Sequence, residues 1–311
     1  MVASRLAAEG GASVRDTCAL LPARPGVYRF RDQRGVGMYV GRTVNLRART
    51  QSYWGGLKGR ARLRRMVPQI SAVEALVCES PHEAAWLERN LLERALPRWN
   101  RARGGLEVPV WLVLDPGPRS PSLRVVHSVD GAPITSGPLL GADRARLTRS
   151  GLLRVWPVAA TGTALSGSER DMADRRALGP VDRDRLVGLI TDALAGQDGA
   201  VALWRAGLIA ARDRAVAGLA FELAGQITEE LDAIDWATGT QRVTVDEPVD
   251  ADVHGWCDGV LVSLEVRGGR MQRWHQRLVP QEPAHALDAT PPHWRAFADE
   301  NAHLAARMLG R

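Results

Sequence analysis

The alternation of apolar and polar residues near the start of the chain predicts a small antiparallel sheet. Residues 27–31 alternate after an Arg-Pro-Gly turn, and residues 37–41 have the pattern of the returning strand of a hairpin. Residues 72–78 form another β-like stretch. Because helical patterns separate and follow these strands, the beginning of the chain predicts an α+β fold in which helices pack against a small sheet.

Three helices are predicted around these strands. Asn45 caps a helix that runs to about residue 53, and residues 60–70 form a basic amphipathic helix. Ser80 caps a third helix, with Pro81 at its first position and Glu83 placed to complete a capping box. The resulting order of elements is ββααβα.

The pattern after residue 105 is less regular and divides the rest of the chain into three segments. We expect a mixed middle region over 106–180, a helical hairpin over 181–240 and a short β-rich segment over 241–311. The expected elements are strands at 108–114 and 123–128, a linker at 159–168, helices over 182–234 with a break at 196–199, strands over 241–275 with a hairpin at Asp258-Gly259, and a helix at 294–308.

The charge differs sharply between the first third of the chain and the remainder. Residues 1–105 carry a net charge of +11, whereas residues 106–311 carry −5, and Lys58 is the only lysine among the cations of the first part. Arginine side chains match the oxygens of phosphate groups. The asymmetry therefore predicts that the first third faces a polyanion such as DNA.

The cysteines and the apolar runs exclude several classes of protein. Cys18, Cys78 and Cys257 lie far apart and form no CxxC pair, so we expect three separate reduced thiols rather than a zinc site or a disulfide framework. No apolar run reaches the length of about 18 residues that a membrane span requires. The N-terminus is a poor signal peptide, and we expect a cytoplasmic protein.

Several short motifs, taken in order, carry a family resemblance. They are Gly26-Val27-Tyr28, Tyr39-Val40-Gly41, a Leu-x-x-Arg at 46–49, Tyr53-Trp54, the stretch 83–90 and Pro97-Arg98-Trp99-Asn100. This order and spacing resembles the N-terminal nuclease domain of UvrC and of its shorter homologue Cho, which are GIY-YIG nucleases of the excision-repair type.

The resemblance implies a catalytic role for four residues. Glu88 would hold one divalent metal ion, Mg²⁺ or Mn²⁺, and the sequence nearby has no acidic cluster of the kind that binds two metals. Tyr28 would be the general base, provided that the metal and arginine charges lower the pKa of its phenol. Arg49 would bind the scissile phosphate. Tyr39 would orient the water or the phosphate, with a role in core packing as the alternative.

Four further residues would support the site. Gly26 and Gly41 belong to the two triplets, and Gly41 is expected to allow a close approach of the backbone. Arg42 occupies a position where UvrC proteins usually have lysine, and the two cations are not interchangeable. Asn100 matches a family asparagine that connects the active site by hydrogen bonds.

A set of cations near the motifs is expected to follow the DNA backbone, which would position a duplex without reading its sequence. The alternative is an ordinary solvated surface. The residues are Arg47, Lys58, Arg60, Arg62, Arg64, Arg65, Arg98 and Arg101.

The resemblance to UvrC continues beyond the nuclease motifs. Residues 154–180, where UvrC usually has a cysteine cluster, contain no cysteine, so we expect no iron–sulfur cofactor. Residues 215–234 resemble the UVR motif, in which Leu219, Phe221 and Glu222 would contact a UvrB-like helicase. Thr228-Glu229 replaces the usual Arg-Asp pair, and an ordinary core-packed helix pair is the alternative.

The function implied is hydrolysis of one phosphodiester bond in damaged or distorted DNA, with the 3′ incision of nucleotide excision repair as the family expectation. The chain has room for one nuclease, because about forty residues follow the last UvrC-like strands. Two alternatives stay open. One is a nuclease for branched or replication DNA, working alongside a proofreading-type exonuclease, and the other is a catalytically weak DNA-binding adaptor for a UvrB-like helicase.

Overall fold

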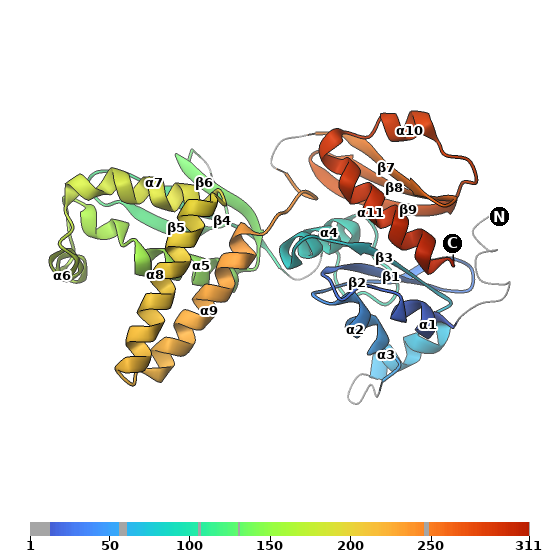
Figure 1. Ribbon diagram of the computed structural model, residues 1–311, viewed down its shortest axis with the longest axis horizontal. Helices are drawn as coiled ribbons and strands as arrows, with labels where there is room; N and C mark the ends of the chain where they lie inside the picture. Colours follow the sequence, from blue (N-terminus) through green and yellow to red (C-terminus); the bar gives the residue numbers. More distant parts are fainter. Residues whose placement is uncertain (1–12, 56–60, 105–106, 130, 246–248, 311) are drawn as a thin grey trace. The chain divides into compact units, whose positions relative to one another are not determined.

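The computed structural model describes residues 13–55, 61–104, 107–129, 131–245 and 249–310. These residues form two compact units, and each unit has its own sheets and helices (Figure 1). Unit 1 combines the beginning of the chain, up to residue 106, with the part from Thr240 onward, and unit 2 extends from Glu107 to Gly239. The structure therefore groups the four segments expected from the sequence into two pairs, because the last segment packs against the first.

The N-terminal part of unit 1 follows the predicted order of strands and helices, with one added short helix at its start. Its elements are α1 (Val14–Ala19), β1 (Gly26–Arg31), β2 (Gly37–Thr43), α2 (Leu46–Gln51), α3 (Ala61–Met66), the 3₁₀ turn η2 (Val67–Gln69), β3 (Ala72–Val77) and α4 (Pro81–Arg94). The strands form an antiparallel sheet in the order β2-β1-β3. The α+β prediction is confirmed.

The C-terminal part of unit 1 is a second antiparallel sheet with helices. Its elements are β7 (Ala251–Cys257), β8 (Val260–Arg267), β9 (Arg270–Leu278), α10 (Ala284–Asp288) and α11 (Pro292–Met308). The predicted hairpin turn at Asp258-Gly259 is confirmed, and both of its residues have positive φ angles. Helix α11 packs so closely on β7 that a Cβ atom at Gly255 would lie 2.2 Å from the carbonyl oxygen of Ala298.

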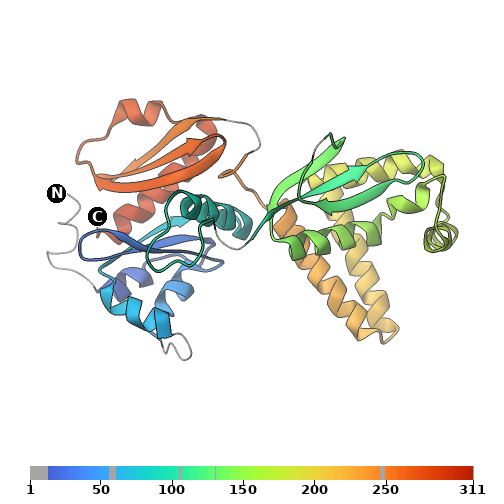
Figure 2. The same ribbon diagram turned by 180° about the vertical axis from the view of Figure 1, so that it is seen from behind.

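The sheet β2-β1-β3 lies between two layers, with α1, α2 and α3 on one side and α4 and α11 on the other (Figures 1 and 2). Tyr28 and Phe30 of β1 are fully buried in one core cluster, which also contains Leu304 and Met308 of α11. Residues separated by almost the whole length of the chain therefore complete the same core.

Asparagine side chains seal both outer edges of this sheet. The Asn100 amide accepts a hydrogen bond from the backbone N–H of Val40 in β2 (3.0 Å) and donates one to its carbonyl oxygen (2.7 Å). Asn301 of α11 makes the equivalent pair with Val77 of β3, at 2.7 and 3.2 Å. Each amide thus satisfies backbone groups that a free strand edge would leave unpaired.

Unit 2 is built from a three-stranded antiparallel sheet and a set of helices. Its elements are β4 (Pro109–Asp115), β5 (Ser122–Val126), β6 (Ile134–Leu140), α5 (Ala142–Val155), η3 (Val158–Thr161), α6 (Gly167–Arg176), η4 (Pro180–Asp182), α7 (Arg183–Leu194), α8 (Asp198–Ala217) and α9 (Phe221–Thr238). The strand order is β5-β4-β6.

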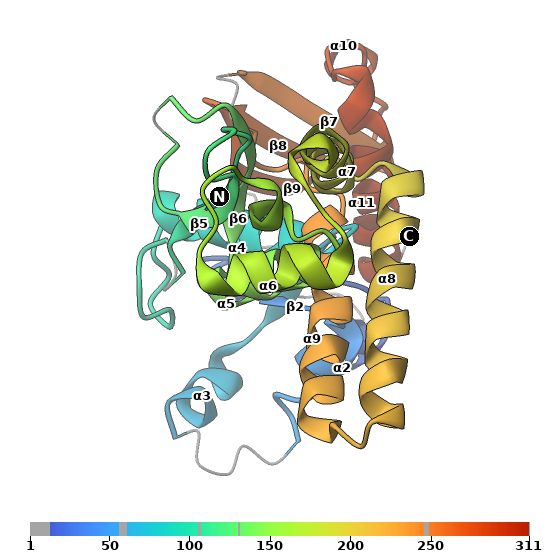
Figure 3. The ribbon, with the colours of Figure 1, turned by 90° about the vertical axis from the view of Figure 1, so that its left-hand side faces the viewer.

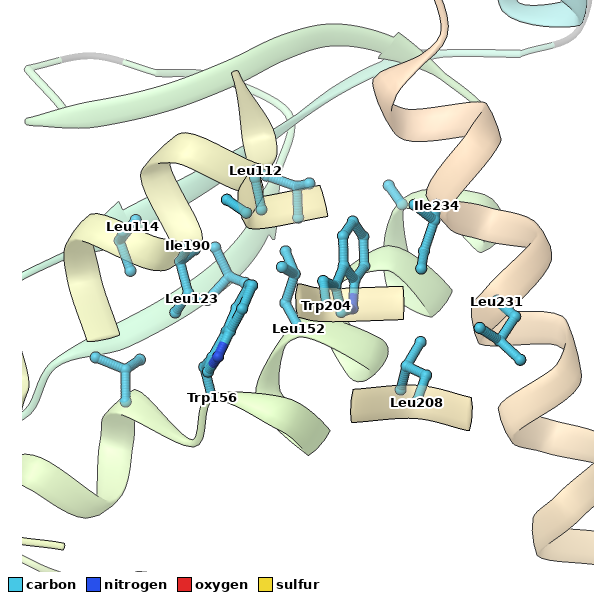
Figure 4. Close-up of a cluster of buried hydrophobic side chains, with 14 of the residues drawn as sticks. Leu112, Leu114, Leu123, Leu152, Trp156, Ile190, Trp204, Leu208, Leu231 and Ile234 are labelled. Atoms are coloured by element: carbon cyan, nitrogen blue, oxygen red, sulfur yellow. The ribbon is translucent and has the colours of Figure 1, made fainter. Parts of the chain in front are cut away.

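One apolar core holds unit 2 together. Leu112 of β4, Trp156 after α5 and Trp204 of α8 point into the same cluster, where Leu231 and Ile234 of α9 join them (Figure 4). Because these side chains come from both ends of the unit, the middle of the chain is a folded body with its own core.

Two sequence expectations for unit 2 were wrong. The expected linker at 159–168 contains a 3₁₀ turn, in which Ala160 and Thr161 are buried, followed by the N-cap Ser166 of α6. The helical stretch over 182–234 also has a second break, at residues 218–220, where Leu219 adopts a positive φ of 59°. The apolar spacing continues across this break, so periodicity alone hides it.

Helices α8 and α9 pack side by side as an antiparallel hairpin, as expected from the sequence (Figure 3). Within the described residues, no single helix is long and apolar enough to cross a membrane. The bent pair formed by residues 180–194 and α8 meets that criterion only jointly, at an angle of 104°. Both helices of this pair contribute side chains to the core of unit 2.

Candidate active site

The two glycine-tyrosine triplets lie side by side in β1 and β2, where Tyr28 pairs with Gly41 in the antiparallel register. A Cβ atom at Gly41 would come 2.7 Å from the Tyr28 hydroxyl and 2.8 Å from the Tyr39 ring. A Cβ atom at Gly26 would lie 2.2 Å from the Leu76 carbonyl oxygen. Both glycines are therefore required by close packing, and Gly41 makes the space that two tyrosine rings occupy.

Three tyrosines form the centre of the site, and they are the only tyrosines in the chain. The hydroxyl oxygens of Tyr28 and Tyr53 lie 2.7 Å apart, and the Tyr39 ring centroid is 6.1–6.2 Å from those of the other two. Tyr53 belongs to one of the sequence motifs, but no role was predicted for it. The scarcity of tyrosine together with the position of Tyr53 beside Trp54 was the signal that would have identified it.

Arg49 reaches the tyrosines from α2. Asn45 caps this helix by accepting the backbone N–H of Ala48 at 2.9 Å, as predicted. The Arg49 Nε donates to the Tyr28 hydroxyl at 3.4 Å, and its guanidinium carbon is 5.2 Å from the centre of the Tyr53 ring. The cation is thus held over the aromatic cluster, while part of its side chain stays exposed.

Burial makes Tyr28 a weaker acid than the expected role as a general base requires. Desolvation, followed by the neighbouring Tyr53 and Tyr39, raises the pKa of Tyr28 well above its ordinary value, and Arg49 only partly opposes this shift. Burial also raises the pKa of Tyr39, and the charge of Glu88 adds to that shift. Without a metal ion, the burial of Tyr28 therefore outweighs the charge of Arg49, and the basic surroundings alone do not lower the pKa of this phenol.

Glu88 lies in α4 and faces Arg42 of β2. The Arg42 Nε and the Glu88 Oε2 are 3.2 Å apart, and the two side chains are 34% and 22% exposed. Burial, followed by the charge of Arg42, lowers the pKa of the nearby His82 to about 4. This histidine was not singled out from the sequence. Because its imidazole is neutral at pH 7, it adds no positive charge to the site.

The donor set around Glu88 fits one hard cation better than a multi-ligand metal centre. Among the described residues, no group of three or more His, Cys, Asp or Glu side chains could hold a metal. Mg²⁺ is commonly bound through one or two carboxylates, with water and phosphate oxygens completing its shell. A partly exposed carboxylate at Glu88 matches that pattern, and Arg42 would have to share the carboxylate or move aside.

Cations predicted to contact DNA are exposed around this site, and one group of them is organised. Arg62 of α3 donates to the carbonyl oxygens of Arg98 (3.1 Å) and Asn100 (3.2 Å). The guanidinium carbons of Arg62 and Arg98 lie 5.9 and 5.5 Å from the Trp99 ring centre. The loop that carries Asn100 is thereby connected to α3.

The remaining cations of that set show less organisation. The Arg47 Nε donates a hydrogen bond to the Leu21 carbonyl oxygen at 2.7 Å, and Arg47 is exposed. Arg64, Arg65 and Arg101 are exposed. Lys58 and Arg60 lie outside the described residues.

Comparisons with known proteins agree with this geometry. Residues 24–101 match the family model described as the UvrC-like GIY-YIG domain. The UvrABC system protein C of Mycobacterium bovis is 30% identical over 292 residues, which cover 88% of this chain and 45% of that protein. The corresponding protein of Mycolicibacterium vanbaalenii is 31% identical over 274 residues, or 81% of this chain and 40% of that protein. The chain thus spans less than half the length of these relatives.

Solved structures of the N-terminal GIY-YIG endonuclease domain of UvrC from Thermotoga maritima also match. The form bound to magnesium, its catalytic divalent cation, is 31% identical and covers 28% of this chain and 96% of that domain, with a TM-score of 0.26. A form in which one tyrosine is replaced by phenylalanine covers 29% of this chain, with a TM-score of 0.27. Residues 24–101 of this chain are therefore similar to the UvrC-like GIY-YIG domain, and similarity to UvrC proteins extends over most of the chain.

Proposed function

We propose that this chain is a DNA endonuclease that hydrolyses one phosphodiester bond with a single divalent metal ion at Glu88. The observation that carries the proposal is the convergence of the tyrosine cluster, Arg49 and the Arg42–Glu88 pair from separate elements of a UvrC-like GIY-YIG domain. Phosphodiester hydrolysis needs an oriented water, a proton acceptor and charge relief on phosphorus, and these groups meet those requirements.

Each side chain has a role that its position supports. Arg49 is partly exposed over the aromatic rings, where its guanidinium can bind the scissile phosphate and stabilise the developing charge. With a metal ion bound, its charge would add to that of Arg49 in lowering the pKa of Tyr28, and the resulting phenolate would take the proton of the attacking water, which Tyr39 would help to orient. Glu88 would hold Mg²⁺ or Mn²⁺, which polarises the phosphate oxygens when bound.

We propose damaged or distorted duplex DNA as the substrate, with a cut on the 3′ side of the lesion. Homology with UvrC over 88% of the chain supports the substrate class, and exposed arginines near the site suit backbone contacts that do not read sequence. An alternative is a nuclease for branched DNA that works alongside a proofreading-type exonuclease.

A panel of labelled duplexes tests the substrate proposal. With Mg²⁺ or Mn²⁺, and with and without UvrA- and UvrB-type loading proteins, we expect a single nick 3′ of a bulky adduct and less than about a tenth of that rate on an intact duplex, a difference of roughly 1.4 kcal/mol. A fork or flap cut in preference to the adduct would favour the branched-DNA alternative.

We also propose that the α8–α9 hairpin binds a UvrB-like helicase through its tip. Ile227, Leu231 and Ile234 of α9 are buried in the core of unit 2, whereas the tip carries exposed apolar side chains. Leu219 is 74% exposed and Phe221 is 65% exposed. Core packing reaches Ala215 and Ala224 but does not account for the exposed side chains at the tip, and an exposed apolar group of this kind is typical of a protein-binding surface.

Removing the two exposed side chains should weaken this interaction selectively. The double substitution Leu219→Ser and Phe221→Ser is expected to reduce affinity for UvrB by at least about tenfold, because aromatic and aliphatic anchors supply much of the binding energy at such surfaces. Val181→Ser is the matched control, since Val181 is an apolar residue of the same unit with 92% exposure. Equal binding by both variants in a pull-down or calorimetric titration would exclude the tip as the contact.

A further inference from the structure

The segment that follows α9 lies along α4, the helix that carries Glu88. We call residues 240–245 the strap. The helix begins after Ser80, whose Oγ accepts the backbone N–H of Glu83 at 2.9 Å as its N-cap. The same Oγ donates to the Thr240 carbonyl oxygen at 2.7 Å. Thr240, the first residue of the strap, therefore contacts the N-cap of α4. It lies two positions after Thr238, where α9 ends.

A buried ion pair connects the strap to the first turn of α4. Glu83 is fully buried, and its Oε1 accepts both the backbone N–H (3.1 Å) and the Nε (3.2 Å) of Arg242. Its Oε2 accepts the backbone N–H of Glu79, so the capping box predicted with Ser80 is only half correct. Glu79 also pairs with Arg242, at 3.0 Å. Burial of a carboxylate is costly unless it is paired and hydrogen-bonded, as Glu83 is here.

A second contact holds the middle of α4, close to the proposed metal ligand. Asn90, two residues beyond Glu88, is 1% exposed. Its Nδ2 donates to the Val243 carbonyl oxygen at 3.0 Å and to the Thr244 Oγ1 at 2.9 Å. The ten residues from Ser80 to Asn90 span about 15 Å of helix. Glu88 lies between the two places where the strap holds α4.

The strap is itself fixed in shape and attached to the C-terminal sheet. The Gln241 side chain donates to the Thr244 carbonyl oxygen (2.6 Å) and accepts its N–H (2.7 Å), which closes a turn. Val243 accepts the N–H of Met271 in β9 at 2.9 Å, and Val245 donates to the Gly269 carbonyl oxygen at 2.8 Å. Helix α4 is therefore held by a braced segment rather than by a loose end of chain.

We infer that the strap is part of the catalytic unit and that Arg242 and Asn90 are positioning residues, which set the place of the Glu88 carboxylate. The inference rests on the proposed function, since it concerns the metal that Glu88 would hold. Residues that orient a metal ligand typically change metal affinity or activity about 10- to 100-fold when they are replaced. The strap follows α9 in the chain and contacts α4 through hydrogen bonds, so residues from a late part of the chain position the helix that carries Glu88.

Metal binding and nicking should both be measured on the full chain. In titrations with Mn²⁺ followed by electron paramagnetic resonance, Arg242→Gln and Asn90→Ala are expected to raise the concentration for half occupancy about tenfold relative to wild type. Arg242→Lys, which retains the cation, should recover part of the difference. Arg267→Gln, which breaks the exposed pair with Asp252 in the same C-terminal sheet, is the matched control and should bind as wild type does.

A purely structural role predicts a different result. In that case Arg242→Gln and Asn90→Ala would lower only the unfolding temperature. The Mn²⁺ concentration for half-maximal binding and the Mg²⁺ concentration for half-maximal nicking would stay within about twofold of wild type at temperatures well below unfolding. That result would overturn the inference. If wild type neither binds Mn²⁺ nor nicks DNA, the proposed function fails instead. In that case amide hydrogen exchange along α4 decides: faster exchange between residues 83 and 90 in both variants supports the strap, and unchanged exchange refutes it.

Discussion

Replacing Glu88 with Gln is expected to lower the nicking rate by about a thousandfold and to abolish its dependence on Mg²⁺ or Mn²⁺ concentration. Glutamine keeps the size of the side chain but removes the charge that would hold a hard cation. Loss of metal stabilisation of the transition state is worth several kcal/mol, and each 1.4 kcal/mol changes the rate about tenfold. The measurement is a metal titration of single-turnover nicking on an adduct duplex, with circular dichroism to show that the fold is retained.

Glu93→Gln supplies the control on the same helix. Glu93 is partly exposed and pairs with Arg89 and Arg270, so its loss should change the rate by less than about threefold, as expected for a pair near the surface. Equal activity of Glu88→Gln and wild type would rule out Glu88 as the ligand. A wild type that binds DNA and never nicks under any metal or partner condition would favour the adaptor, in which the Arg42–Glu88 ion pair simply persists.

The substitution Gly41→Ala is expected to reduce the nicking rate by about a hundredfold, because a misplacement of about 1 Å at a reacting group can cost that much. The added methyl group would lie 2.7–2.8 Å from atoms of Tyr28 and Tyr39, both of which would have to shift. Overpacking of a core also costs about 1–3 kcal/mol of stability. The rate should therefore be measured well below the unfolding temperature.

Gly37→Ala, in the same strand, separates the two effects. A Cβ atom there would meet the Cδ atom of Arg29 at 3.3 Å, and no tyrosine is among its nearest neighbours. We expect nearly normal activity from this variant. If Gly41→Ala and Gly37→Ala nick equally fast, the close packing at Gly41 does not control the reacting geometry, and its role is limited to folding.

The nuclease-like sheet could be predicted from sequence because its signals are local. Alternation marks β1 and β2, Asn45 and Ser80 cap their helices as expected, and the triplets bring Tyr28 and Tyr39 together. The full burial of Tyr28 could not be predicted, because burial depends on which elements cover a strand. A count of nearby arginines cannot show that a phenol is fully desolvated.

Long-range packing explains most of what the sequence could not provide. Strand β6 contains Gly137 and Pro138, which weaken a strand pattern, and it was missed together with helix α5. The break at Leu219 lies within an unbroken apolar spacing. The contacts of Arg242 with Glu83 and of Asn301 with Val77 join residues 159 and 224 positions apart, and no local pattern specifies such pairs.

The two sealed edges of the β2-β1-β3 sheet are completed at different moments of synthesis. Asn100 follows Val40 of β2 by 60 residues and becomes available early, whereas Asn301 is translated 224 residues after Val77. A ribosome adding about 5–20 residues per second therefore leaves the β3 edge open for at least about ten seconds. Unit 2 emerges entirely within that interval. Until Asn301 is translated, the backbone groups of Val77 at this edge lack the partner that α11 supplies, and an open strand edge can pair with a neighbouring chain.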